Sequence, residues 1–143
     1  MREMERIFAV IDTNVIVSSF FSPDGLSAPA IVVGAVLRGA IIPVFNDDIL
    51  NEYKEVLSRS KFPFNESQIE LILSAFKDFG INVERTIVAE ESFPDPDDIV
   101  FYEVKMSVDD AFLVTGNNRH FPHNSLVVTP SEMVEILLGR GLL

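Results

Sequence analysis

The fold is decided near the start of the chain by five uninterrupted apolar residues and an acid, Ile7-Phe8-Ala9-Val10-Ile11-Asp12. A short run without polar alternation predicts a strand that is covered on both faces, as in a parallel sheet. Successive parallel strands need a crossover connection, which is usually a helix. We therefore expect strands and helices to alternate along the rest of the chain, with Asp12 as the last residue of the first strand.

Capping and turn residues divide the remainder of the chain into such elements. Residues 99–108 are rich in β-branched side chains and would suit a strand nearly as well as a helix, but the alternation of elements favours a crossover helix there. The predicted elements are a helix from Val15 to Phe21 capped by Thr13 or Asn14, a helix from Ala28 to Arg38, a strand from Ile41 to Phe45, a helix opened by Asn46 or Asp47, a helix from the capping box at Asn65 and Gln68 to Gly80, a strand from Val83 to Val88, a helix from Ile99 to Val108, strands from Ala111 to Val114 and from Leu126 to Val128, and a helix that follows the capping box Thr129-Pro130-Ser131-Glu132 and stops at Gly139.

These elements predict an α/β fold, a three-layer α/β/α sandwich around a central, mostly parallel sheet, with residues 1–143 as a single domain. A hydrophobic content of 48% argues against intrinsic disorder. No run approaches the roughly 18 apolar residues of a membrane-spanning helix, and Met1 to Arg6 are too charged for a signal peptide. We expect a soluble, cytoplasmic protein without membrane contact.

The charge balance limits the partners of the chain. It has 11 Lys and Arg against 22 Asp and Glu, a net charge of −11, which repels phosphate backbones and argues against a protein that coats duplex nucleic acid. An acidic chain can still act on nucleic acid if its carboxylates hold divalent cations where the phosphate must lie. Because the chain has no cysteine, any metal must be held by oxygen or imidazole ligands.

Polar residues at the carboxyl ends of the predicted strands mark the candidate site, because ligands of open parallel sheets bind at that edge. Asp12 ends the first strand, Thr115-Gly116-Asn117 follows the strand at 111–114, and Asp95, Asp97 and Asp98 precede the helix that begins at Ile99. Helical spacing places Glu52 at the border of the apolar stripe of its helix, whereas Glu55 faces water. Four separate segments thus bring acidic or amide side chains toward one region.

Each of these features also has a purely structural interpretation. An aspartate at the end of a strand is often a turn or cap residue, and aspartates before a helix compensate its dipole. A glutamate on a helix is most often a solvated residue, and His120 and His123 are more typical of loop hydrogen bonding than of metal binding. The convergence of several carboxylates is what favours a chemical role.

Taken in order, the motifs resemble those of PIN domains, and the resemblance spans almost the whole chain. It is most similar to the toxin components of toxin–antitoxin systems, the VapC-type ribonucleases, whose pattern includes a proline-rich acidic loop and a Thr-Gly-Asn followed by His-Phe-Pro. The motifs are Ile7 to Asp12 with Thr13-Asn14-Val15, Asn51-Glu52-Tyr53 with Val56-Leu57, Pro94-Asp95-Pro96-Asp97-Asp98 with Phe101, and Leu113-Val114-Thr115-Gly116-Asn117 with His120-Phe121-Pro122.

The resemblance implies a metal-dependent ribonuclease whose acids gather around Mg²⁺ or Mn²⁺. Asp12, Glu52 and Asp98 match the first three acids of the family and would be both the catalytic residues and the metal ligands, with Asp97 as the alternative to Asp98. The fourth acid of the family is Asn117 here, which puts a two-metal arrangement in doubt unless Asp95 or Asp97 substitutes. Asn14 and Thr115 match polar residues that position the acids or water.

The same resemblance implies an RNA substrate, an antitoxin partner and a homodimer. Leucines at the C-terminus, Leu137, Leu138, Leu142 and Leu143, could supply a dimer surface or complete the core. The few cations near the candidate site are the available contacts for phosphates, and we expect Arg119 and either Arg59 or Lys61 to bind the RNA backbone.

Two other functions stay open. The chain could be a PIN-like binding module that has lost catalysis with its fourth acid. It could also be a phosphatase with Asp12 as the nucleophile, as in haloacid-dehalogenase-like enzymes. That family has a second aspartate two positions after the first, where this chain has Asn14, and no lysine lies in a suitable strand-end context.

Overall fold

The structure is a computed structural model that describes residues 6–143; residues 1–5, most of the charged segment that argues against a signal peptide, lie outside the described part. The elements in chain order are β1 (Ile7–Ile11), α1 (Thr13–Phe20), α2 (Ala28–Leu37), β2 (Ile41–Phe45), α3 (Asp47–Leu57), α4 (Glu66–Phe79), β3 (Ile81–Asn82), the 3-10 turn η1 (Pro96–Asp98), α5 (Ile99–Met106), β4 (Phe112–Val114), the 3-10 turn η2 (Asn118–His120), β5 (Val127–Val128) and α6 (Pro130–Gly139).

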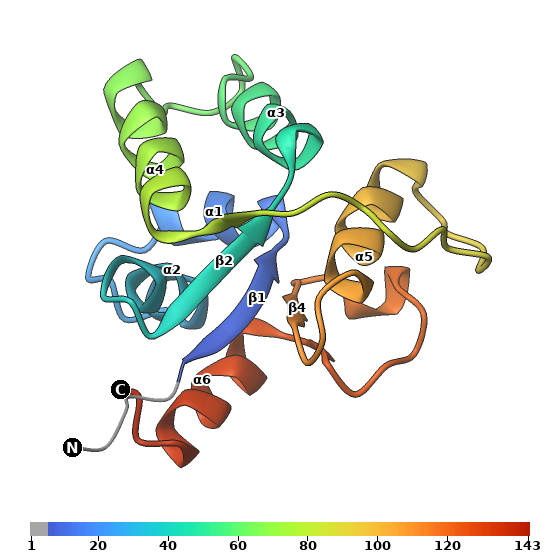
Figure 1. Cartoon of the computed structure of the whole chain (residues 1–143). Helices are drawn as coiled ribbons and strands as arrows, with labels where there is room; N and C mark the ends of the chain where they lie inside the picture. The colour runs from blue at the N-terminus through green and yellow to red at the C-terminus, as the bar shows by residue number, and fades with distance from the viewer. Residues whose placement is uncertain (1–5) are drawn as a thin grey trace.

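The five strands form one parallel sheet in the order β3-β2-β1-β4-β5, which confirms the predicted α/β class. Helix α5 packs against β1, β2 and β4 on one face. Helix α2 packs on β2, α1 and α6 on the other face, so the sheet is the middle layer of three (Figure 1). From β1 the chain moves first to β2 and β3 and later to β4 and β5 on the opposite side. This reversal places a topological switch point, where open α/β sheets bind ligands, between β1 and β4.

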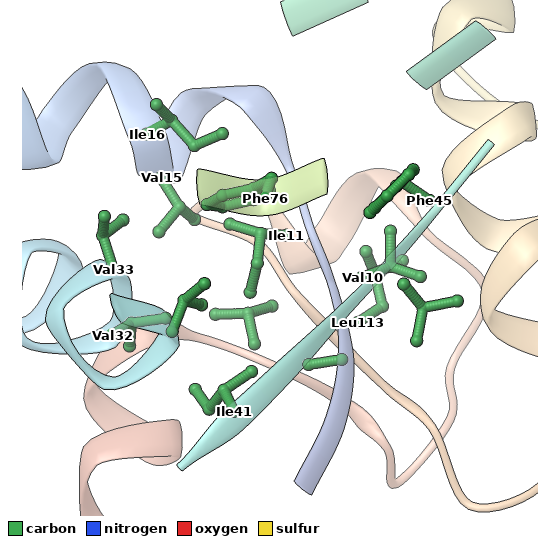
Figure 2. Close-up of a cluster of buried hydrophobic side chains, with 14 of the residues drawn as sticks. Val10, Ile11, Val15, Ile16, Val32, Val33, Ile41, Phe45, Phe76 and Leu113 are labelled. Carbon is green, nitrogen blue, oxygen red and sulfur yellow. The ribbon is translucent and has the colours of Figure 1, made fainter. Parts of the chain in front are cut away.

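The apolar run at residues 7–11 forms the centre of this sheet because both of its faces are covered. Four of its five residues are buried. Figure 2 shows Ile11 beside Val15 and Phe76, and Val10 beside Leu113, as expected for side chains that alternate along a strand. Core packing on both faces holds the end of β1, and therefore Asp12, in a fixed position.

Most predicted elements occur within two residues of their expected bounds, including α5 at the segment where a strand was the alternative. The capping boxes at Asn65 with Gln68 and at Thr129 with Glu132 both form. The predicted caps of α1, Thr13 or Asn14, are wrong, because Asp12 occupies the N-cap position. Asp12 makes no side-chain capping bond there, and its carboxylate is directed to other partners described below.

The strand predicted from Val83 to Val88 is also wrong. Strand β3 comprises only Ile81 and Asn82, paired with the last two residues of β2, after which Val83 donates one further backbone bond to Phe45. Beyond Phe45 the neighbouring chain turns into α3, so residues 84–88 have no strand to pair with, and β-propensity alone does not make a strand. This segment is held instead by side chains of α5 and of its C-cap residue Ser107. Thr86 N–H donates to Ser107 Oγ at 2.9 Å, and Ala89 N–H donates to Glu103 Oε2 at 2.6 Å.

The junction between α4 and β3 requires the glycine that ends the predicted helix. A Cβ atom at Gly80 would collide with the carbonyl oxygens of Pro43 and Phe76 and with the Phe45 ring. The close approach lets α4 return directly onto the edge of β2. No helix in residues 6–143 has the length and apolar character needed to cross a bilayer.

Candidate functional site

The register of the sheet brings Asp12 and Thr115 together. Ile11 of β1 is paired with Val114 of β4, so the next residue of each strand leaves the same edge of the sheet. Asp12 N–H donates to the Val114 carbonyl at 2.9 Å, and the Thr115 hydroxyl donates to Asp12 Oδ2 at 2.7 Å. Both residues are buried, with Asp12 at 6% and Thr115 at 0% exposure. The pair joins residues 103 positions apart in the chain.

Two amide groups support this pair. Asn14 Nδ2 donates to Asp12 Oδ2 at 3.4 Å, while its Oδ1 accepts from the Gly116 N–H at 3.1 Å, so Asn14 bridges the first turn of α1 and the loop after β4. The Asn117 N–H donates to Thr115 Oγ1 at 3.0 Å, which leaves the Thr115 hydroxyl proton free to point at Asp12. These contacts fix the orientation of the Asp12 carboxylate.

The Asp12 carboxylate is buried and, within residues 6–143, is not paired with a lysine or arginine. Burial raises its pKa and the nearby charge of Asp95 raises it further, while the Thr115 hydrogen bond and the charge of His120 oppose the shift. Tyr53 of α3 donates a hydrogen bond from its hydroxyl to the carbonyl of Ile11, the residue before Asp12. The Tyr53 pKa is well above its usual value because the ring is buried and because Asp12 is close.

Asp98 is the second acid of this region. It ends η1 directly before α5, and its side chain is 16% exposed. Burial, followed by the charges of Asp12 and Asp95, raises its pKa to about 6. His120 Nδ1 lies 3.9 Å from Asp98 Oδ2, and within residues 6–143 neither Asp98 nor Asp12 forms an ion pair with a lysine or arginine.

The aspartates before Asp98 have a structural part as well. Asp95 caps η1 by accepting the Asp97 N–H at 2.9 Å, and Asp97 is exposed. The charge of Asp97 is the leading electrostatic cause of the raised Glu52 pKa, whereas the charges of Asp12 and Asp95 come before that of Asp97 in raising the Asp98 pKa. This arrangement favours Asp98 over Asp97 as the partner of Asp12, and that assignment stays a prediction.

Glu52 lies at the rim of the site rather than at its centre. It is half-buried on α3 and Glu55 is exposed, as helical spacing predicts. Burial raises the Glu52 pKa, followed by the charges of Asp97 and Glu55. Across residues 6–143, no three Asp, Glu or His side chains converge closely enough to enclose a metal ion. The structure therefore brings together Asp12 and Asp98 but does not draw Glu52 onto them.

The predicted RNA-binding cations are placed differently from one another. Arg59 donates to Glu55 at 3.2 and 2.9 Å and is near enough to Glu52 and Asp97 for their charges to raise its pKa after that of Glu55. Lys61 lies over the Phe62 ring, and Arg119 is exposed in η2. Arg59 is thus the cation placed nearest to Glu52 by these interactions.

A comparison with protein families shows which family the chain belongs to. The model of the PIN domain matches residues 9–119, which include the end of β1, all of α3, the acidic loop and the Thr115 segment. The chain belongs to the PIN domain family. PIN domains are a nuclease family and are typically metal-dependent, and the parallel five-stranded sheet is consistent with the PIN fold. No match was found among curated proteins or among solved structures.

The donor set of Asp12 and Asp98 fits a metal of the kind that PIN domains use. Carboxylate oxygens are the ligands that Mg²⁺ and Mn²⁺ prefer, and Mg²⁺ commonly binds one or two carboxylates while it keeps several waters. The charge of Asp12 raises the pKa of Asp98, and a bound cation would relieve this repulsion. Thr13 Oγ1, next to Asp12, is a buried hydroxyl without a hydrogen-bond partner among the described residues. These features fit an ion held by few carboxylates and completed by water and phosphate.

Sequence reasoning missed two residues of this site. The sequence gives Tyr53 only as part of the Asn51-Glu52-Tyr53 motif, and nothing in its spacing shows that its hydroxyl reaches the carbonyl that precedes Asp12. His120 was read as a loop residue, although it lies two residues beyond Asn118, where η2 turns the chain back toward Asp98. The nearest sequence signal was the His120-Phe121-Pro122 of the motif, which begins three residues after Asn117.

Proposed function

We propose that this PIN domain is a metal-dependent endoribonuclease and the toxin of a toxin–antitoxin pair. The observation that carries the proposal is Asp12: a carboxylate at 6% exposure, held in orientation by Thr115 and Asn14 at the switch point of the sheet. Among the described residues, the acid Asp95 adds to its charge and no lysine or arginine pairs with it. A buried acid without a neutralising partner is costly and is typical of a site that receives a cation.

The roles follow from the positions of the side chains. Asp12 would hold Mg²⁺ or Mn²⁺ as the central ligand and Asp98 as the second. When bound, the ion supplies positive charge that stabilises phosphate oxygens and eases deprotonation of an attacking water. Thr115 and Asn14 keep the Asp12 carboxylate in place. Glu52, at the rim and with a raised pKa, is placed to accept a proton from water outside the two-acid centre.

The chain's own cations would orient the substrate. Arg59, whose charge environment includes Glu52, and Arg119, exposed after the Thr115 segment, would contact backbone phosphates. Because only a few cations are available in a chain of net charge −11, we expect RNA affinity to fall shallowly with salt, with a log–log slope of roughly −1 to −2 for a single strand.

The test is cleavage of a 5′-labelled single-stranded RNA by purified protein in Mg²⁺, in Mn²⁺ and in EDTA. We expect cleavage that needs a divalent ion and falls at least about 100-fold in Asp12→Asn, since several kcal/mol of charge stabilisation is lost. Asp78→Asn, at an exposed position of α4, is the matched control and keeps the wild-type rate. Equal rates in Asp12→Asn and wild type would refute the proposal.

The toxin role needs a separate test in cells. Induced expression of the wild-type chain is expected to arrest growth, whereas Asp12→Asn at the same protein level does not. Growth without arrest, together with cleavage in vitro, would separate the nuclease from the toxin and favour a role in RNA processing.

One observation favours a second candidate function, a binding module without catalysis. Asn117 stands where the family has its fourth acid, and no three acids converge among the described residues. RNA binding without cleavage in any divalent ion would support this alternative over the nuclease.

A further inference from the structure

Four phenylalanines gather at the surface where α1 ends. Phe20 and Phe21 come from the end of α1, and Phe62 and Phe64 from residues 58–65 between α3 and α4. The Phe62 and Phe64 rings are stacked with centroids 5.2 Å apart and planes at 14°. Phe20 meets Phe64 edge-on at 4.7 Å, and Phe21 lies 5.2 Å from Phe64 and 6.2 Å from Phe62. We call these four rings the aromatic cluster.

Core packing does not account for the outer part of this cluster. Phe20 and Phe64 pack against the hydrophobic core and anchor it. Phe21 is 55% exposed, and Phe62 is half-buried. Exposed aromatic groups that adjoin each other mark a surface that binds something.

One cation lies beside the rings, and a second lies in the same segment. Lys61 Nζ is 5.2 Å from the centroid of Phe62, within the range of a cation–π contact. Arg59, two residues earlier, carries a charge that is felt by Glu52. The chain has a net charge of −11, yet this segment combines aromatic rings with two cations. Such a segment is complementary to a ligand that has both flat bases and negative charge.

Two helices connect the cluster to the candidate site. Helix α1 begins directly after Asp12 and ends at Phe20, a length of eight residues or about 12 Å. Helix α3 carries Glu52 and leads into the segment with Phe62, and the two helices are in contact (Figure 1). At about 3.4 Å per stacked nucleotide, the cluster is roughly three to four nucleotides from Asp12.

We propose that the aromatic cluster is a stacking platform that holds unpaired bases of single-stranded RNA a few nucleotides from the scissile phosphate. Phe62 and Phe21 offer the rings, and Lys61 binds an adjacent phosphate. The inference rests on the proposed function, because it supplies the substrate contact that the acidic centre lacks. Bases in a duplex are already stacked on each other, so the platform selects single strands.

The experiment measures binding by fluorescence anisotropy with Asp12→Asn protein, which does not cut its ligand. The probes are a labelled ten-nucleotide uridine RNA, an abasic ribose-phosphate oligomer of equal length, and an RNA duplex. Phe62→Ala is expected to weaken the binding of uridine RNA roughly tenfold and to leave the affinity for the abasic oligomer unchanged, since only the stacking contact is removed. Phe62→Tyr keeps a ring and keeps the affinity.

Three further variants complete the design. Phe21→Ala repeats the test at a residue whose exposure makes a folding defect unexpected. Phe79→Ala, 50% exposed at the far end of α4, is the matched control and has no effect. Lys61→Ala weakens the binding of both single-stranded probes by the same factor, because it removes a phosphate contact.

Equal losses on the uridine and abasic probes, or no loss in either phenylalanine variant, would overturn the platform. A change in oligomeric state in Phe21→Ala with unchanged RNA affinity would instead assign the cluster to a protein interface and overturn it as well. If wild type cleaves RNA and Phe62→Ala does not change RNA affinity, only this inference fails. If binding depends on the rings but no RNA is cleaved, only the nuclease proposal fails.

Discussion

Two buried carboxylates in this molecule have the same exposure and different surroundings. Glu103 of α5 and Asp12 after β1 are both 6% exposed. Glu103 accepts from Arg85 Nη1 at 2.7 Å and from the Ala89 N–H at 2.6 Å. Asp12 accepts from the hydroxyl of Thr115 and the amide of Asn14, and the charges near it include Asp95.

The difference separates structure from chemistry. At Glu103 the chain supplies a cation and a backbone donor, and the result fastens residues 84–89 onto α5. At Asp12 it supplies neutral donors that orient the carboxylate without neutralising it. The cost of burying a carboxylate that is not neutralised is retained at functional sites because a bound ligand relieves it.

The largest effect on stability is expected at Glu103. Glu103→Ala leaves the Ala89 N–H without its acceptor and Arg85 without its main partner, and we expect a loss of about 2 kcal/mol in the free energy of unfolding, measured by urea denaturation. Glu103→Gln keeps an acceptor and costs less. A change below about 0.5 kcal/mol in Glu103→Ala would show that the two carboxylates are not as different as their partners indicate.

The opposite sign is expected at Asp12. Asp12→Asn keeps an acceptor for Thr115 and removes a buried charge from an acidic cluster, so metal-free protein should gain about 1 kcal/mol of stability while cleavage is lost. The gain should vanish or reverse in millimolar Mn²⁺, because only wild type binds the ion at this position. Thermal unfolding of both proteins, with and without Mn²⁺, provides the comparison, and an identical Mn²⁺ response would argue against Asp12 as a ligand.

A smaller, pH-dependent effect is expected from Asp98. Its pKa is about 6 in the folded protein against 3.8 as the ordinary value, so the folded state binds a proton more readily than the unfolded state. The contribution of Asp98 to stability therefore grows as pH falls through 6 and is absent well above it. We expect the melting temperature of metal-free wild type to rise by about 1–2 °C relative to Asp98→Asn between pH 7.5 and 5.5. A rise of equal size in both proteins would contradict the assignment to Asp98.

The smallest effect is expected at the exposed pair of Arg59 and Glu55, whose side chains are 45% and 59% exposed. Glu55→Gln should change the free energy of unfolding by less than about 0.5 kcal/mol, since surface ion pairs contribute little. Arg59→Ala should leave stability equally unchanged and weaken RNA binding, which equilibrium titration at fixed Mg²⁺ would measure. A stability loss above 1 kcal/mol in either variant would mean that the pair is structural, as at Glu103.

Features set by local sequence were predicted well. The apolar run at 7–11, the capping boxes at Asn65 and Thr129 and the orientation of Glu52 on its helix all follow from spacing within a few residues. The expected parallel sheet also places Asp12 and Thr115 at the same edge, because the carboxyl ends of parallel strands share that edge. The roles of Asp12, Glu52 and Asp98 stay predictions.

Features set by distant partners were not predictable in this way. The segment at 83–88 has the composition of a strand, but whether it pairs depends on where β2 ends. The Glu103–Arg85 ion pair and the tilted ring contact of Phe62 with Phe21 join segments whose proximity only the folded chain defines. Sequence spacing cannot show them, because no local pattern marks either partner.

The bond between Thr115 and Asp12 also affects when the protein becomes competent during its synthesis. Residues 103 positions apart must meet before the carboxylate is oriented. At about 5–20 residues per second, the ribosome takes roughly 5–20 s to add the intervening segment. Over that interval, and in any product truncated before Thr115, the acid has no positioning hydroxyl. A chain proposed to cut RNA is thereby kept incomplete while it is still attached to the message that encodes it.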